Sequence, residues 1–316
     1  MSTADSYLRD PASGGWLHFA APVGVLDART PADVPPLLEE LECAVDADDL
    51  TAVGFISYEA AGAFDSALTT LPPGTLPLAW FGLYREPARL AKRAPPPPPT
   101  HTLSGWSPSI SRDEYTRALA RIHEHIAAGN TYQVNFTYRL TSPFAGDTFR
   151  LWRLCAHDRQ GVYGAFIDTG DFVIASASPE LFFECGNNRI RTKPMKGTAA
   201  RGTTLDDDNE RARRLSDSKK DRAENVMIVD MIRNDLGRVA RPGSVRVPRL
   251  FNVERYPTVW QMTSTVEAET SATVSQIFRA MFPCASVTGA PKPKTMEIIA
   301  DLENRPRGVY CGAIGF

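Results

Sequence analysis

Apolar and polar positions along the chain follow two periods, and together they predict a mixture of strands and helices. Continuous apolar runs at Ala52–Tyr58 and Leu76–Tyr84 predict buried strands. Ser111 and Glu114 then form a capping-box pattern, and apolar residues recur every three or four positions after it, as far as Gly129. This spacing predicts a helix that ends at Gly129.

Large apolar side chains alternate with polar ones over residues 132–140, which predicts one continuous strand. Gln133 and Asn135 fall on its polar face. A solvent-facing strand is the simpler interpretation of that face. The alternative is that Gln133 lines a cleft.

The second half of the chain contains further short strands and several helices. Apolar runs separated by turn residues predict two hairpins, and helical spacing with charged first turns predicts three helices. A glycine-rich strand is expected at the end. The hairpins pair Tyr163–Asp168 with Phe172–Ala177 and Leu181–Cys185 with Arg189–Lys193; the helices are Asp206–Leu215, about Ser218–Leu236, and a third through about Glu303; the last strand is Gly308–Phe316.

A run of five prolines, Pro95–Pro99, divides the pattern, since such a run predicts an extended spacer. We therefore expect an N-terminal region at 1–92, a proline-rich linker at 93–103, and a larger domain at 104–316.

Composition narrows the class of protein. The formal net charge of −2 gives no global basic field for nucleic acid. No apolar run approaches the length of a membrane span, and Met1–Pro11 lacks the features of a signal peptide. The five cysteines are scattered without a CxxC pair, which favours reduced thiols in the cytoplasm.

The stretch Arg189–Gly202 is basic and contains no acid, and Lys196 lies near its centre. Pro194 and Gly197 predict a strand that breaks into a turn at this lysine. Like charge from Arg191 and Lys193 would lower the pKa of Lys196 and make it a better nucleophile. The alternative is a solvated basic loop.

Two acids and one helix start are further candidates. Glu180 follows Ser178-Pro at the start of a strand, where an acid is usually a surface residue. Glu224 lies among apolar residues of a helix, so either a metal ion or a salt bridge to Lys220 would explain it. Residues 288–295 place two lysines at a helix N-terminus, which favours an anion site.

Four of these motifs, taken in order, resemble those of the chorismate-utilising enzymes. They are Ser178-Pro-Glu180, Pro194-Met-Lys-Gly-Thr198, the run from Arg222 to Asp235, and Thr288-Gly-Ala-Pro-Lys292. Phe55-Ile-Ser-Tyr-Glu-Ala-Ala61 resembles, more weakly, the N-terminal part of the same enzymes. The resemblance implies an α+β fold: a two-lobed sandwich of large antiparallel sheets with helices outside.

Within the family, Lys196 combined with Gln133 resembles the aminodeoxychorismate synthases of folate biosynthesis. The resemblance implies that Lys196 is the nucleophile, that Glu180 is the general acid, and that Glu224 binds Mg²⁺. It also implies chorismate as substrate and a separate glutamine amidotransferase that supplies ammonia. The residues that it implies for substrate binding are Gln133, Gly197, Thr198, Thr288, Gly289 and Tyr310.

Two departures from the family pattern carry further expectations. Gln261 stands where many relatives have a histidine, which leaves open the group that assists the departing hydroxyl. The family also continues beyond Phe316, so we expect a chain that lacks its C-terminal part and does not turn over chorismate alone.

The alternatives are an anthranilate synthase or another chorismate enzyme, and a truncated, inactive chain that binds a ligand or partner. Tryptophan binding near Tyr58 and Glu59 would fit the last of these, although a packed core tyrosine is the simpler interpretation.

Overall fold

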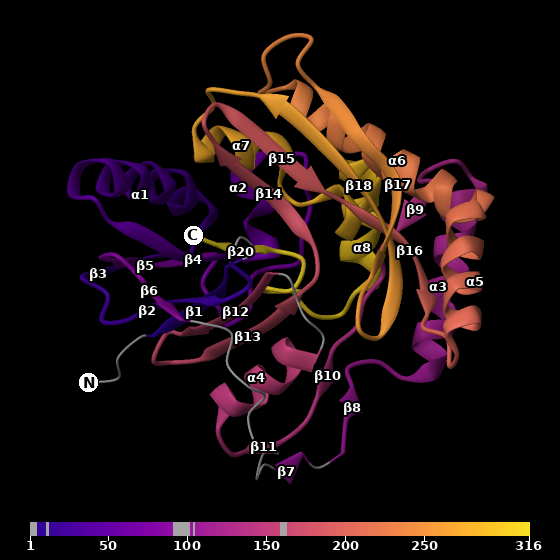
Figure 1. Ribbon diagram of the computed structural model, residues 1–316, viewed down its shortest axis with the longest axis horizontal. Coiled ribbons are helices and arrows are strands. Elements are labelled where there is room, and N and C mark those ends of the chain that lie inside the picture. Colours follow the sequence, from indigo (N-terminus) through magenta and orange to yellow (C-terminus); the bar gives the residue numbers. More distant parts are fainter. Residues whose placement is uncertain (1–4, 11–12, 91–101, 104, 159–162) are drawn as a thin grey trace.

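The computed structural model describes residues 5–10, 13–90, 102–103, 105–158 and 163–316 (Figure 1). Three larger antiparallel sheets organise these residues, and helices cover their outer faces. None of the helices in these ranges is long and apolar enough to cross a membrane.

The first sheet joins the start of the chain to its middle. Helix α4 (Thr148–Asp158) covers one face of it, where Trp152 and Ala156 pack against Phe166. The strands, in order across the sheet, are β13 (Val173–Ser178), β12 (Tyr163–Asp168), β1 (Ser6–Arg9), β2 (Trp16–Phe19) and β6 (Ala88–Leu90).

The second sheet packs face to face against the first. Phe19 of the first sheet lies in one buried cluster with Val53 and Tyr84 of the second, and Ile167 lies in another with Phe55 and Trp80. The strands, in order, are β20 (Ala313–Gly315), β4 (Thr51–Ile56), β5 (Ala79–Tyr84) and β3 (Gly24–Ala28).

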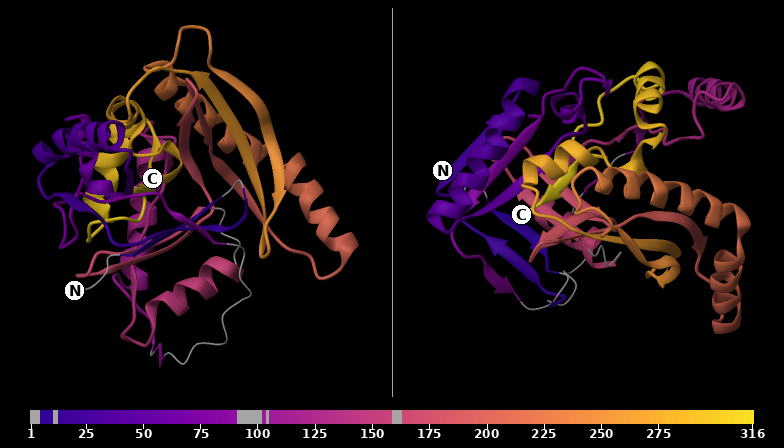
Figure 2. Two further views of the ribbon diagram at one scale, coloured as in Figure 1. Left: turned by 60° about the vertical axis from the view of Figure 1, so that its left-hand side comes forward. Right: turned by 90° about the horizontal axis from the view of Figure 1, so that it is seen from above.

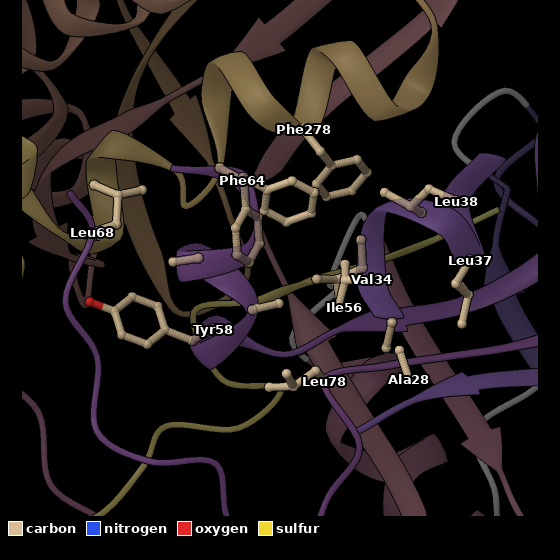
Figure 3. Close-up of a cluster of buried hydrophobic side chains, with 14 of the residues drawn as sticks. Ala28, Val34, Leu37, Leu38, Ile56, Tyr58, Phe64, Leu68, Leu78 and Phe278 are labelled. Atoms are coloured by element: carbon tan, nitrogen blue, oxygen red, sulfur yellow. The ribbon is translucent and has the colours of Figure 1, made fainter. Parts of the chain in front are cut away.

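Helices cover the outer face of this second sheet. Figure 3 shows Leu37 and Leu38 of helix α1 (Val34–Asp48) beside Ile56, with Phe64 stacked near Phe278. The short elements here are η1 (Pro31–Asp33), η2 (Tyr58–Ala60) and α2 (Ala61–Phe64).

A third sheet contains Lys196, and residues 246–269 form its long hairpin (Figure 2). Its strands are β14 (Leu181–Gly186), β15 (Arg189–Lys193), β16 (Met195–Ala200), β17 (Arg246–Arg255) and β18 (Val259–Glu269). Helix α6 (Lys219–Gly237) buries Ile228 and Ile232 against Ile190 and Val266 of this sheet, and α7 (Val274–Met281) completes the cluster. Helix α5 (Leu205–Asp217) precedes α6.

The remaining elements surround the third sheet and the sandwich. They are α3 (Arg112–Ala127), η3 (Ala285–Val287), α8 (Lys292–Leu302), and the strand pairs β9 (Gln133–Val134) with β19 (Gly289–Ala290), β10 (Leu140–Thr141) with β8 (Ser107–Pro108), and β11 (Phe144–Ala145) with β7 (Thr102–Leu103).

The expected α+β sandwich of antiparallel sheets with outer helices is confirmed. Strands from 1–92 and strands from 104–316 share the first two sheets, because β1 pairs with β12 and β4 pairs with β20. Residues 93–101, including Pro95–Pro99, lie outside the described residues, and the division at 93–103 stays a prediction.

The predicted strand over residues 132–140 is wrong for most of its length. Only Gln133–Val134 and Leu140–Thr141 pair with other strands. Between them the backbone N–H groups find other partners: Thr137 donates to the Glu303 carboxylate, and Arg139 donates to the Ser109 hydroxyl. Alternation predicted a continuous strand, whereas residues 135–139 are held by isolated backbone and side-chain hydrogen bonds.

The predicted strand Gly308–Phe316 is also too long, because Gly308–Gly312 form turns before β20. Cys311 has a left-handed φ of 65°, which a continuous strand does not allow. The predicted helices are confirmed within a few residues, including the capping box that Ser111 and Glu114 form at α3.

Candidate active site

Lys196 lies in a β-bulge of β16. Met195 pairs with Thr263 and Thr198 with Gln261, so Lys196 and Gly197 together oppose a single residue of β18. A bulge of this kind re-aims side chains and is common beside active sites. The predicted turn at Lys196 is therefore a bulge within a strand that continues to Ala200.

Glycine is required at position 197 for two reasons. Its φ of 94° lies in the left-handed region, and a Cβ here would stand 2.9 Å from the Asp221 Cβ. The Gln261 amide holds the backbone directly after Gly197. Its Nε2 donates to the Gly197 carbonyl, and its Oε1 accepts from the Thr198 hydroxyl. The glutamine that departs from the family pattern thus holds the bulge.

The Lys196 ammonium is half-buried and donates to the Ser286 carbonyl oxygen at 3.0 Å. Burial lowers its pKa, and nearby Glu180 and Glu224 oppose that effect. The Lys196 pKa is therefore lowered, as expected. The expected cause, like charge from Arg191 and Lys193, is wrong. Arg191 and Lys193 form ion pairs of their own, with Glu184 and Glu254 respectively.

Glu180, the residue directly before β14, also contacts Ser286. Its Oε1 accepts a hydrogen bond from the Ser286 hydroxyl at 2.5 Å. Burial raises the pKa of Glu180 to about 6, while Ser286 and then Lys196 act in the opposite direction. A carboxyl with this pKa is suited to exchange a proton near neutral pH. The interpretation of Glu180 as an ordinary surface acid is therefore wrong.

Ser286 and Cys284 were missed by sequence reasoning. The Cys284 Sγ lies 3.1 Å from the Ser286 Oγ, and burial raises the pKa of this thiol to about 12, so it stays protonated. Their position directly before the motif at Thr288 was the available signal.

Glu224 lies on α6 with its side chain 39% exposed, and its Oε1 is 3.7 Å from the Lys220 Nζ. The salt bridge offered as one explanation is therefore present. Glu224 also acts electrostatically on Lys196, where it opposes the lowering of the lysine pKa. Within the described residues no three His, Cys, Asp or Glu side chains cluster as a metal site. A single exposed carboxylate suits Mg²⁺, which binds through one or two carboxylates together with substrate and water.

Gln133 pairs with the motif at Thr288 through β9 and β19. Its side-chain Oε1 is buried without a hydrogen-bond partner. Gly289 leaves room for this strand, because a Cβ there would stand 1.9 Å from the Gln133 carbonyl oxygen. The fully buried Thr288 hydroxyl donates to the Cys284 and Ala285 carbonyls at the start of η3. These contacts bring Gln133, Thr288 and Gly289 beside the Ser286 turn.

Tyr310 is 62% exposed, on the turn before β20. The neighbouring Arg307 connects this turn to the site, since it donates to the Val287 and Asn135 carbonyls and pairs with Glu303. Its guanidinium also lies 4.7 Å from the ring centre of Tyr58. Substrate binding by Thr198, Thr288, Gly289 and Tyr310 stays a prediction.

Tyr58 and Glu59 are core residues, 2% and 4% exposed. Glu59 accepts hydrogen bonds from the backbone N–H groups of Arg307 and Gly308. Tyr58 is therefore a packed core tyrosine, which was the simpler interpretation.

Both lysines of the predicted anion site at the start of α8 are paired with carboxylates. Lys292 is only 12% exposed and donates to Asp235 at 2.9 Å and to the Met281 carbonyl. Lys294 pairs with Glu297 on the surface. The fourth motif therefore packs against the end of the third through a buried ion pair.

The model of the chorismate binding enzyme family matches residues 4–316. The chain belongs to this family. Among curated family members, aminodeoxychorismate synthase component 1 of Klebsiella aerogenes is 42% identical over 240 residues, which cover 74% of this chain and 53% of that protein. Anthranilate synthase component 1 of Streptomyces coelicolor is 36% identical over 315 residues, covering 84% and 61%.

Solved structures of the family share the fold. Anthranilate synthase component I of Streptococcus pneumoniae matches with a TM-score of 0.77 at 23% identity, covering 100% of this chain and 78% of that one. An isochorismate synthase structure from Bacillus anthracis gives 0.77 at 17% identity, covering 99% and 81%. The chain spans about half the length of the aminodeoxychorismate synthase relatives that it matches.

Proposed function

We propose that the chain is the chorismate-binding part of an aminodeoxychorismate synthase component 1, which converts chorismate and ammonia to 4-amino-4-deoxychorismate. The observation that carries the proposal is the pair Lys196 and Glu180, whose pKa values are both shifted by burial toward the neutral forms. A neutral amine is a nucleophile and a protonated carboxyl is an acid. Four aminodeoxychorismate synthase component 1 relatives at 37–42% identity support the same assignment.

In the proposed reaction the Lys196 amine forms a bond to C2 of chorismate while the ring double bond shifts. The C4 hydroxyl leaves as water after Glu180 gives it a proton. Ammonia then adds at C4, the double bond shifts back, and the C2–N bond to Lys196 breaks; the new C4 ammonium gives one proton back to Glu180. Lys196 and Glu180 return to their starting states, and the net change is replacement of hydroxyl by amine.

Gln133 supports ammonia rather than water as the nucleophile, because an amide is not a base that can activate water. Its buried Oε1 has no hydrogen-bond partner and is therefore available to an N–H donor.

We propose Mg²⁺ as the cofactor, with Glu224 as one of its ligands. The ion would hold a substrate carboxylate and draw electron density toward it. Glu224→Gln should then raise the Mg²⁺ concentration needed for half-maximal activity. Superimposable Mg²⁺ titrations for the two proteins would make Glu224 a structural residue.

The proposed partner is a glutamine amidotransferase that supplies ammonia. The name component 1, which several relatives carry, supports an assembly with a further subunit. All five cysteines are free, which supports a reducing compartment and the cytoplasmic location that we propose.

The central test is Lys196→Ala in a protein extended at its C-terminus to the length of the relatives, assayed with chorismate, Mg²⁺ and excess ammonium. We expect a loss of at least about a thousandfold in amination, because removing a covalent nucleophile removes the step itself. Lys294→Ala, on the surface, is the matched control and should keep full activity. Unchanged product formation by Lys196→Ala would reject the proposal.

Product analysis separates the two amination reactions in the family. The second candidate, anthranilate synthase, is supported by the 36% identical relative that covers 84% of this chain. Release of anthranilate instead of 4-amino-4-deoxychorismate by the C-terminally extended wild-type protein would favour it.

A further inference from the structure

Ser286 contacts both groups of the proposed catalytic pair, through two different atoms. Its side-chain hydroxyl donates to Glu180 at 2.5 Å, and its backbone carbonyl accepts from the Lys196 Nζ at 3.0 Å. Ser286 is 5% exposed, so water does not compete freely for either bond. In the sequence it lies 106 positions from Glu180 and 90 from Lys196, and only the fold brings the three together.

We propose that Ser286 is a positioning residue that holds Glu180 and Lys196 in fixed geometry. None of the ion pairs formed by the described residues joins Lys196 to Glu180. A direct pair would favour the ammonium and the carboxylate, which are the wrong charge states for a nucleophile and an acid. A serine between them supplies hydrogen bonds to both groups without a formal charge.

The turn that carries Ser286 is itself rigid. The Thr288 hydroxyl donates to the Cys284 and Ala285 carbonyls, and Arg307 donates to the Val287 carbonyl at 2.8 Å. Thr288 and Arg307 thus fix the backbone on either side of Ser286. The carbonyl that meets Lys196 and the hydroxyl that meets Glu180 therefore keep one orientation relative to each other.

The inference rests on the proposed function only for its catalytic consequence, so its first test uses no substrate. Glu180 is titrated by carbon-13 NMR of the glutamate carboxyl carbons, with Glu180→Gln to assign its signal. Loss of the donated hydrogen bond in Ser286→Ala should raise the midpoint of Glu180 by about one pH unit, because a hydrogen bond to the carboxylate favours the charged form. The other titratable groups that act on Glu180 or border it are Lys196, Cys284 and Tyr256.

Three variants make this result specific. Ser286→Thr keeps a hydroxyl and should restore the wild-type midpoint. Ser275→Ala changes another buried serine, on α7, and should leave the midpoint unchanged. Ser286→Cys, a weaker donor, replaces Ser286→Ala if the alanine variant does not fold.

The second test uses activity with chorismate. Ser286→Ala should lower kcat at least tenfold with little change in KM, and the alkaline limb of the rate profile should move up with the Glu180 midpoint. If no variant of the C-terminally extended protein turns over chorismate, the proposed function fails while the NMR result still decides the role of Ser286. A Glu180 midpoint that is the same in folded Ser286→Ala and wild type, or that Ser286→Thr does not restore, would overturn the inference.

Discussion

Glu180 links the chemistry of one residue to the pH dependence of stability. Its folded pKa of about 6 lies above the ordinary glutamate value of 4.5, so between these values the folded state binds more protons than the unfolded state. The free energy of unfolding therefore contains a contribution that is complete below about pH 4.5 and is lost as the pH rises through 6.

Glu180→Gln removes this proton equilibrium. Relative to wild type, we expect the variant to gain about 2 kcal/mol of unfolding free energy between pH 4 and pH 7, since each unit of pKa difference corresponds to about 1.4 kcal/mol. Urea unfolding at several pH values measures the difference. A difference between the two proteins that does not change with pH would show that Glu180 titrates as an exposed acid.

The sequence singled out Lys196 and Glu180 as candidates but did not reveal the groups that shift their pKa values. Lys196 and Glu180 stand in recognisable motifs, and both have perturbed pKa values. The like-charge argument for Lys196 was wrong because charged neighbours in the sequence pair elsewhere once the sheet forms. Ser286 could not be identified, since its two contacts depend on a loop that meets the strand only in the folded chain.

At the scale of elements, the buried pair of Lys292 and Asp235 connects the start of α8 to the end of α6. Both side chains are 12% exposed. Lys292→Met should lower the free energy of unfolding by about 3–5 kcal/mol, because it leaves a buried carboxylate without its partner. The double variant Asp235→Leu with Lys292→Met should recover much of that loss.

The control for this pair is Lys294→Met. Its partner Glu297 is half exposed, and we expect a change within about 1 kcal/mol. Thermal unfolding of all three variants makes the comparison. Equal, small effects of Lys292→Met and Lys294→Met would mean that the buried pair contributes no more than a surface pair.

Elements with strong local signals were predicted well, and elements that depend on distant partners were not. The Ser111 capping box fixes the start of α3 within the local sequence. The chain at residues 135–139, in contrast, is held by Glu303 and Ser109, which no alternating pattern reveals. Helix α1 and the β17–β18 hairpin were not predicted at all.

At the scale of the whole molecule, the two regions on either side of residues 93–101 form one folding unit, because they share two sheets. Chains 1–92 and 102–316, expressed together as separate polypeptides, should copurify, because β1 and β4 find their partners in the second chain. Chain 1–92 alone exposes unpaired strand edges and should aggregate. A soluble 1–92 chain with a dispersed NMR spectrum would contradict this expectation.

The pairing of β4 with β20 has a consequence for synthesis on the ribosome. Ile56 emerges early, and Ala313, its partner across the sheet, emerges more than two hundred residues later. At bacterial or eukaryotic rates of elongation, that edge of β4 waits on the order of ten seconds or more for its neighbour. During this interval the nascent chain presents an open, apolar strand, so it is the growing polypeptide rather than the finished protein that most needs a chaperone.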